Sequence, residues 1–591
     1  MAKSYYEALQ SSRGKRAAVA IAISVVAFWL QMLIGVSGAD DDWAMSLFLS
    51  NAYPDSGYTL FIHPWMSAFV SFLFDVLPWG PNYFLILEIG LSCAATCVIT
   101  YYALGHLNIG AAVCVVSVVI LFPVPMCTQN LNFTSVTGLV ACAGFVLLFV
   151  QLLEKRCNVV ASVVGALFLC VACMLRFKGF LLCAPFALVL AIVGFVRSRD
   201  LQLKKRALLF VPLASSLALC GALAVSSDIL MQQPDLKAWQ DITLPRSDLA
   251  DYPKKSYSEV ADQLTEIGVS ENDYWLATHW TMNDTSYFTA EKLRQIADIA
   301  CVHPDMSPME FVKSAGTYLL RLGGKPFVAL VIAASVLLLF GSWRRAPRLE
   351  KWAAIGVLAI TLCILAYLTA AGRMILRIEY PIWTYGLIAL ALPLGMGARG
   401  GTGLLPAHES GRAQAAAELA RFAIAVLFVF LVGLVTFMEA IESPSELPMK
   451  SLLGDTLENE SELLEYQADH ADCVFAYDYN TFGNVGYLYE RRGVPSKDLM
   501  RTIQNLGGWE YGATFLDEEL AAKTGLDCGL FEAFAKSDKV FLVAGDDGYA
   551  KHVLEYIREH YDPTAELQVV ETIRDSEMDK SFLVMRFVSA R

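Results

Sequence analysis

Long apolar runs separated by short polar connections occupy most of the chain before residue 442. The first run, residues 17–36, carries no charge over the roughly 20 positions that a helix needs to cross a membrane. The pattern predicts a polytopic α-helical membrane protein with about 11 transmembrane helices. The further runs lie at 83–104, 109–125, 133–153, 158–175, 179–196, 207–227, 326–342, 352–371, 378–396 and 420–441.

A cleaved signal peptide is the competing interpretation of the first run, because Gly35, Ser37 and Ala39 are small enough for a cleavage site. The run is longer than the apolar region of about 7 to 15 residues that is typical of signal peptides. Many more runs follow it. We therefore expect residues 17–36 to remain as the first span.

Positive charges mark one side of the predicted membrane domain as cytoplasmic. They precede the first run and then cluster in alternate connections, as the positive-inside rule requires. An odd number of spans with a cytoplasmic N-terminus places the C-terminal region outside, and we expect a multi-pass protein of the plasma membrane. The cytoplasmic charges are Lys3, Arg13, Lys15, Arg16, Lys155, Arg156, Arg197, Arg199, Lys204, Lys205, Arg206, Arg344, Arg345, Arg348, Lys351, Arg399, Arg412 and Arg421.

Four cations depart from this rule. Arg176 and Lys178 lie in one short connection that is predicted to be external, and Arg373 and Arg377 lie in another. Cations at headgroup depth on the unfavoured side suggest an anionic ligand, such as a lipid phosphate or pyrophosphate, which arginine can bind through two hydrogen bonds. The alternative is that they reach to lipid headgroups or pair with Glu379.

Three regions are predicted to leave the membrane on the outer side. The first, 37–82, includes an apolar stretch from Trp65 to Leu77 that is too short for a span and predicts an interfacial helix. The second, 228–325, is polar and aromatic. The third, 443–591, has strand-like segments at 474–477, 540–544 and 582–588 with helical stretches between them, which predicts a soluble external α/β domain beside a membrane domain of residues 1–442.

Composition and charge support this division. The chain is 56% hydrophobic and 17% charged, whereas soluble domains are about a quarter charged. Residues 443–591 contain 14 Lys and Arg against 28 Asp and Glu, a difference of −14, while the whole chain has a net charge of −13. The membrane domain is therefore nearly neutral. An acidic external domain argues against nucleic acid as a partner.

Three consecutive aspartates, Asp40, Asp41 and Asp42, follow the first apolar run. Carboxylates at a membrane boundary are costly unless they bind a cation, pair with one or move a proton. Mutual repulsion should raise the pKa of at least one of them, unless a divalent cation such as Mg²⁺ or Mn²⁺ neutralises the group. They are candidate catalytic residues, and candidate metal ligands only if such a cation is used.

The loop that contains these aspartates resembles a loop of a known enzyme family. The segments Ala39-Asp40-Asp41-Asp42-Trp43-Ala44-Met45, Ser50-Asn51-Ala52-Tyr53 and Ile62-His63-Pro64-Trp65 resemble the first external loop of the GT-C superfamily of polytopic glycosyltransferases. This family includes protein mannosyltransferases and lipid A aminoarabinose transferases. The resemblance implies a GT-C-like membrane fold and transfer of a sugar from a polyprenyl-(pyro)phosphate donor. The acceptor, a glycan, lipid or protein, stays open because a Trp-Trp-Asp signature is lacking.

The residues suit this chemistry. Transfer to an acceptor hydroxyl needs a carboxylate that takes a proton and fixed positive charge for the departing phosphate. Asp41 or Asp42 is the candidate base, and Arg176, Lys178, Arg373 and Arg377 are candidates for the phosphate. His63 is a candidate for substrate positioning, or else a histidine satisfied at an interface. Trp280, Asp284 and Tyr287 are candidates for binding sugar, or else they form the core of the loop.

Two other classes stay open. A secondary transporter or a lipid or glycan flippase is also polytopic, although repeated halves and charged residues within spans are typical of it. Glu88 is the main charge within a predicted span, and we find no internal repeat. A glycan polymerase or ligase of a different fold is the remaining alternative.

Overall fold

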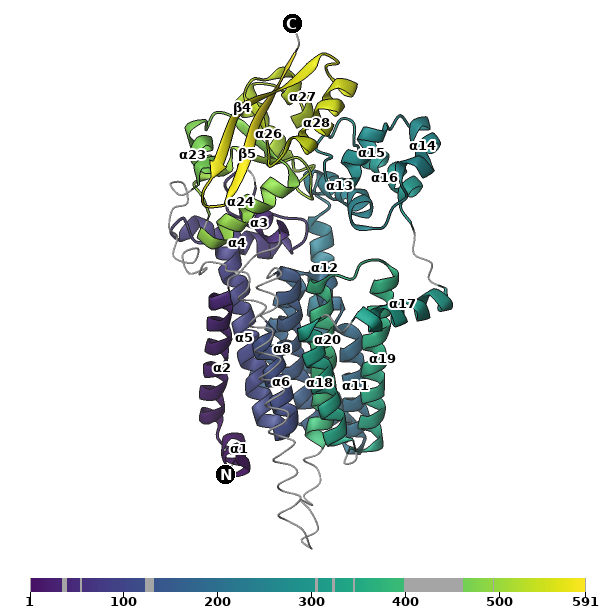
Figure 1. Ribbon diagram of the computed structural model, residues 1–591. Coiled ribbons are helices and arrows are strands. Elements are labelled where there is room, and N and C mark those ends of the chain that lie inside the picture. Colours follow the sequence, from purple (N-terminus) through teal and green to yellow (C-terminus); the bar gives the residue numbers. More distant parts are fainter. Residues whose placement is uncertain are drawn as a thin grey trace.

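The computed structural model describes residues 2–34, 40–53, 56–122, 132–302, 307–321, 325–343, 346–397, 461–492 and 494–589. A bundle of long helices forms one end of the molecule, and a small sheet domain with helices around it forms the other (Figure 1). The predicted span at 420–441 lies outside the described residues.

The bundle contains helices at the first ten of the predicted spans. Among the described residues, five segments are long and apolar enough to cross a membrane: α5, α8, α10 with α11, α12 and α19. The count of about 11 spans stays a prediction, because several of the other helices are shorter. The bundle helices are α1 (Ala2–Ser11), α2 (Arg13–Ile34), α5 (Tyr83–His106), α6 (Ile109–Leu121), α8 (Phe133–Glu154), α9 (Val159–Leu175), α10 (Phe177–Leu181), α11 (Ala184–Arg197), α12 (Leu203–Leu230), α18 (Pro326–Ser342), α19 (Arg348–Ala370) and α20 (Leu376–Gly397).

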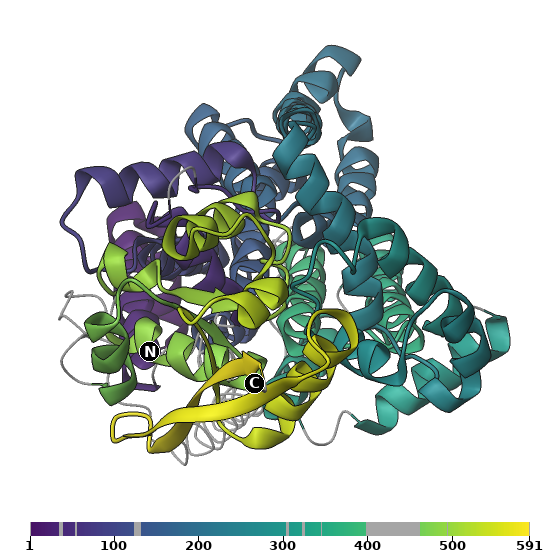
Figure 2. The same ribbon diagram turned by 90° about the horizontal axis from the view of Figure 1, so that it is seen from above.

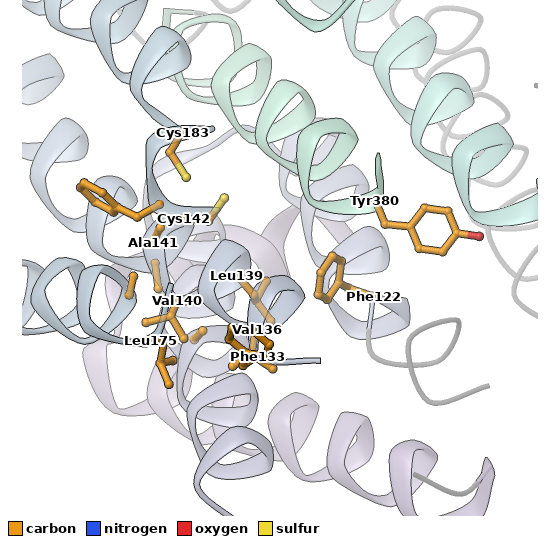
Figure 3. Packing of buried hydrophobic residues seen from close by; sticks show 14 of the residues in the cluster. Phe122, Phe133, Val136, Leu139, Val140, Ala141, Cys142, Leu175, Cys183 and Tyr380 are labelled. Atoms are coloured by element: carbon orange, nitrogen blue, oxygen red, sulfur yellow. The ribbon is translucent and has the colours of Figure 1, made fainter. Parts of the chain in front are cut away.

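Helix α8 is the centre of the bundle, and every residue from Phe133 to Leu153 is buried. Figure 3 shows this packing around Val136, Leu139 and Val140. Small residues allow its neighbours to come close. A Cβ on Gly144 would lie 2.7 Å from Leu169 of α9, so a larger residue there would force the two helices apart.

The end of the molecule that carries the sheet domain contains two further groups of helices (Figure 1). The first loop forms α3 (Asp40–Leu49) and α4 (Pro64–Val76), and the second external region forms α13 (Pro234–Asp251), α14 (Tyr257–Glu266), α15 (Glu271–Thr278), α16 (Ala290–Ala300) and α17 (Pro308–Arg321). Helix α4 confirms the helix predicted from Trp65 to Leu77. Its Trp65, Phe69 and Phe72 are exposed, as suits a helix lying at a membrane surface.

The sheet domain has five strands in the order β2-β1-β3-β5-β4. Strands β1 (Val474–Tyr477), β2 (Ile503–Asn505) and β3 (Val540–Ala544) are parallel, while β5 (Lys580–Ser589) runs antiparallel to β3 and to β4 (Ala565–Asp575). The strand predictions at 474–477, 540–544 and 582–588 are confirmed. The helices of this domain are α23 (Glu462–Asp469), α24 (Tyr479–Arg492), α25 (Lys497–Met500), α26 (Thr514–Thr524), α27 (Leu530–Lys536) and α28 (Asp547–His560).

Aromatic side chains join the sheet domain to the first loop and to α13. Phe48 of α3 contacts Phe515 and Trp509 of the sheet domain, with ring centroids 4.8 and 5.5 Å apart. Trp239 of α13 stacks on Trp509 and donates its indole N–H to the Trp509 carbonyl at 2.8 Å. Seen from above, the sheet domain lies over the N-terminal part of the bundle (Figure 2). These contacts fix the loop that carries the aspartates between bundle and sheet.

Candidate active site

Asp41 and Arg377 form the centre of the candidate site. Asp41 lies in the first turn of α3, and Arg377 lies in the first turn of α20. The Arg377 guanidinium donates from Nη1 to Oδ2 of Asp41 at 2.9 Å, and both side chains are partly exposed. A partly exposed carboxylate and its paired cation therefore lie at the end of the bundle that is nearer the sheet domain.

Asp42 is buried, and its partners are residues at the start of α8. Its carboxylate accepts hydrogen bonds from Nδ2 of Asn132 at 2.7 Å and from the N–H of Phe133 at 3.0 Å, so it holds the first turn of α8. Burial raises the pKa of Asp42 to about 7, and the Asp41 charge adds to the rise, while the Phe133 N–H and the Glu88 side chain oppose it. The sequence predicts a raised pKa in this group through mutual repulsion, whereas at Asp42 burial is the main cause and the Asp41 charge is a smaller one.

Arg176 lies beside both aspartates. Its guanidinium stacks on the rings of Phe61 and Phe133, at 4.7 and 4.9 Å from their centroids. Burial lowers the pKa of Arg176 to about 10, and the charges of Asp41 and Asp42 oppose this change, so the group stays cationic at neutral pH. The charges of Arg377 and Arg373 also act on Arg176, so three of the four predicted cations lie within electrostatic reach of one another, and Arg377 alone of these three contacts Asp41 among the described residues.

Arg373 and Lys178 have other surroundings. Arg373 forms an ion pair with Asp251 of α13 at 2.5 Å and stacks on Tyr252. Lys178 is exposed on α10. The alternative that these cations pair with Glu379 is wrong for Arg373 and Arg377, since Glu379 accepts the Tyr318 hydroxyl at 2.6 Å and pairs with Lys325.

Arg246 of α13 is a candidate that the sequence analysis missed. It is 3% exposed, and its Nε and Nη1 have no hydrogen-bond partner among the described residues. The guanidinium lies 5.1 Å from the ring centroid of Trp280. Burial lowers the pKa of Arg246, whereas the charges of Asp251, Glu510 and Asp41 raise it, which places Arg246 within electrostatic reach of the candidate site. The one feature of the sequence that pointed to Arg246 was its position in the polar segment Leu244-Pro245-Arg246-Ser247-Asp248.

His63 is enclosed by the protein. Its Nδ1 accepts the N–H of Trp65 at 3.1 Å and caps α4, while Nε2 contacts the Leu223 carbonyl and the Ser226 hydroxyl of α12 at 3.1 and 2.9 Å. Burial lowers the pKa of His63, which favours the neutral ring. The alternative of a histidine satisfied at an interface accounts for all of these contacts, and the predicted role in substrate positioning lacks a free ring nitrogen.

The three candidates from the second external region have separate surroundings. Trp280 has a positive φ of 64° and stacks on Tyr479 of the sheet domain, next to Arg246. Asp284 is 1% exposed and accepts the hydroxyls of Tyr556 and Tyr561. Tyr287 donates to Asp273. Trp280 therefore lies beside Arg246. Asp284 joins the helices α13–α16 to the sheet domain through its hydrogen bonds, and Tyr287 does so through ring contacts with Tyr556 and His560. The role in sugar binding stays a prediction for all three.

Asp41 and Asp42 have different partners, because Asp41 contacts Arg377 while Asp42 contacts Asn132 and Phe133. The side chain of Asp40 lies outside the described part of the chain. Within that part, the one group of three side chains with suitable ligand atoms is Asp273, Glu559 and His560. A divalent cation at the aspartates stays a prediction.

Fold and site together indicate a multi-pass membrane protein in which an ion pair, Asp41 with Arg377, lies near an α/β domain. No protein-family model and no curated protein matches the chain. The crystal structure of ArnT from Cupriavidus metallidurans bound to undecaprenyl phosphate is similar over 96% of this chain and 97% of that chain, with 11% identity and a TM-score of 0.42. The likeness is distant and gives no residue of this chain a role.

Proposed function

We propose that this chain is a membrane glycosyltransferase that moves a sugar from a polyprenyl phosphate or pyrophosphate donor to a hydroxyl of a cell-envelope glycan, lipid or protein. The observation that carries the proposal is the pairing of Asp41 with Arg377, with Arg176 alongside, at the outer end of the bundle. A carboxylate and two arginines are the groups that this transfer requires.

Each group has one task in this reaction. The acceptor oxygen attacks the anomeric carbon of the sugar, its proton passes to Asp41, and the bond from the anomeric carbon to the phosphate oxygen breaks. The phosphate leaves on the lipid, and its negative charge is stabilised by Arg377 and Arg176. Arg377 takes part in both proton transfer and departure of the phosphate, because it contacts the proposed base and would bind the departing phosphate.

Asp41 is the better base of the two candidates. Its side chain is 26% exposed, so an acceptor hydroxyl can reach it, whereas Asp42 is 4% exposed and already accepts two hydrogen bonds. Asp42 then acts as a positioning residue that sets the start of α8 beneath the site.

Arg246 and Trp280 extend the site towards the sheet domain. A buried guanidinium with unused N–H groups beside an indole ring suits an acceptor that carries hydroxyl or anionic groups and an apolar sugar face. The site would face the outside of the plasma membrane, since the positive charges of the sequence segregate to the other end of the helices.

A proton-coupled transporter or flippase is the second candidate, and one observation favours it. Asp42, with a pKa of about 7, interacts with Glu88 of α5, and such a carboxyl pair can hold and release a proton near neutral pH.

Mass spectrometry of lipids that co-purify with the protein, combined with a transfer assay, separates these functions. The protein in nanodiscs is mixed with a synthetic polyprenyl-phosphate sugar and envelope extract, and wild type is compared with Asp41→Asn. We expect a lipid-linked sugar in the preparation and a new glycosidic product that the variant does not form. Movement of the lipid across the membrane without any new glycosidic bond would refute the enzyme and support the flippase.

A further inference from the structure

A polar cavity opens in the sheet domain, away from the aspartates. It encloses about 470 Å³, within the range of about 300 to 1,000 Å³ that is typical of small-molecule sites. Nearly all of the side chains that line it are polar or charged. They come from the segment after β1, from the segment after β3 and from the start of β5: Asp478, Asn480, Thr481, Asn484, Asp546, Lys580, Ser581 and Phe582, with the backbone of Gly545.

The topology of the sheet explains the place of this cavity. The chain leaves β1, crosses to β2 on one side, and returns to β3 on the other side of β1. In open α/β sheets, ligands bind where such neighbouring parallel strands send their connections in opposite directions, beyond the carboxyl ends of the strands. Asp478 directly follows β1 and Gly545 directly follows β3. The cavity therefore lies at the ligand-binding position of this fold type.

Phosphate ligands do not suit the cavity. Two helices begin beside it, and each has a carboxylate at the backbone N–H groups that would otherwise face an anion. Asp478 accepts the N–H of Thr481 at 2.6 Å, and Asp546 accepts the N–H of Gly548 at 2.8 Å. These two carboxylates stand against one ammonium, that of Lys580, so a phosphate would meet a net negative charge.

Metal ions do not suit it either. The Lys580 ammonium lines the cavity and donates to Oδ1 of Asn484 at 2.6 Å. The one cluster of potential metal ligands within the described residues, around Asp273 and His560, involves none of the side chains that line this cavity. The cavity also offers neutral donors and acceptors, the amides of Asn480 and Asn484 and the hydroxyl of Ser581, beside the two carboxylates and the ammonium.

Helix α24 connects the cavity to the candidate active site. Asn480, Thr481 and Asn484 lie on one face of this helix. At about 100° per residue, Phe482 and Gly486 lie on the opposite face. That face packs on α3, where the ring of Phe482 lies 5.7 Å from that of Trp43, and a Cβ on Gly486 would lie 2.3 Å from Trp43. One helix thus separates the cavity from the residue that follows Asp42.

We propose that this cavity binds a neutral saccharide through the side chains of Asn480, Asn484, Ser581 and Lys580. Amides, hydroxyls and an ammonium match the vicinal hydroxyls of a sugar, each of which both donates and accepts. The cavity is separate from the site of transfer, so the inference concerns binding and holds whether or not the chain transfers sugar.

Saturation-transfer NMR tests this on the full chain in nanodiscs free of glycoside detergent. The probes are neutral trisaccharides of glucose, galactose, mannose and arabinose, with inorganic phosphate, AMP and Ca²⁺ as competitors. We expect saturable binding of at least one trisaccharide. The Asn480→Ala/Asn484→Ala double variant removes two hydrogen-bonding amides and should weaken binding by about tenfold or more.

Two matched variants complete the test. Gln568→Ala removes an exposed amide on β4, away from the cavity, and should bind as wild type does. Arg377→Gln alters the candidate active site and should leave trisaccharide binding unchanged, while the Asn double variant should leave binding of the polyprenyl phosphate unchanged. The inference is overturned if no trisaccharide binds, if the double variant binds as wild type does, or if phosphate, AMP or Ca²⁺ displaces the sugar.

Discussion

Arg377 and Asp41 are 336 positions apart in the sequence, and the Arg377 guanidinium donates to the Asp41 carboxylate at 2.9 Å. The contact joins the first turn of α20 to the first turn of α3, so it forms only when the end of the bundle and the first external loop have come together. The proposed base and the proposed phosphate-binding cation are thereby placed next to each other, and both remain partly exposed.

Asp41→Asn should abolish most sugar transfer. A general base contributes about 10²- to 10⁴-fold to rate, and the amide keeps the shape of the carboxylate without accepting a proton. Donor binding, followed by titration with a polyprenyl phosphate, should stay near the wild-type value. Asp75→Asn is the control, since Asp75 is an exposed carboxylate on α4 of the same loop. Full transfer activity in Asp41→Asn would remove the catalytic role from this residue.

The arginines should fall into two groups. Arg176→Gln and Arg377→Gln should each weaken binding of a polyprenyl phosphate by about 1.5 to 3 kcal/mol, the range of a hydrogen bond to a charged group. Lysine at either position should rescue only partly, because it lacks the planar fork. Arg373→Gln should have a smaller effect, because Arg373 is paired with Asp251. Wild-type donor affinity in all three variants would indicate that these arginines contact lipid headgroups and do not form a phosphate site.

Local pattern and charge predicted the parts of this molecule that depend on neighbours in sequence. The apolar runs, the helix after His63 and three of the five strands follow from residue order alone. Strand β2 has three residues, and β4 is an edge strand with mainly exposed side chains, so neither produces a strong apolar pattern.

The arrangement of the site could not be predicted from the sequence, because it depends on contacts between residues that are far apart in the chain. Nothing in the Asp40-Asp41-Asp42 run shows that Asp41 faces an arginine while Asp42 is buried against the start of α8, because adjacent residues of a helix point about 100° apart in a direction set by packing. Arg246 was missed for the same reason, since its burial comes from tertiary packing.

Stability should depend on pH through Asp42. Its folded pKa of about 7 exceeds the value of 3.8 for an unperturbed aspartate, so between these values the folded protein holds a proton that the unfolded chain has lost. This contribution to the free energy of unfolding is fully present below about pH 4 and is lost as the pH rises to about 7. Wild-type Tm should therefore fall more than that of Asp42→Asn between about pH 5 and about pH 8. If the Tm of Asp42→Asn falls with pH as steeply as that of wild type, the raised pKa of Asp42 is contradicted.

Arg246→Met should separate stability from function. The buried guanidinium leaves two nitrogens without hydrogen bonds among the described residues, so an apolar side chain of similar length should hold Tm at or above the wild-type value. Transfer should fall through a higher KM for the acceptor, with donor binding unchanged. Lower Tm together with unchanged acceptor KM would show that Arg246 is structural.

The orientation of the molecule can be checked with single cysteines. Asp498 is exposed on α25 of the sheet domain, and Cys157 is exposed between α8 and α9, beside the cluster Lys155 and Arg156 that the positive-inside rule places in the cytoplasm. In a background without other reactive thiols, Asp498→Cys should react with an impermeant thiol reagent on intact cells. Cys157, kept alone, should react only after permeabilisation, which makes it the matched control. The reverse pattern would put the sheet domain and Asp41 on the cytoplasmic side, where an outward-facing site could not operate.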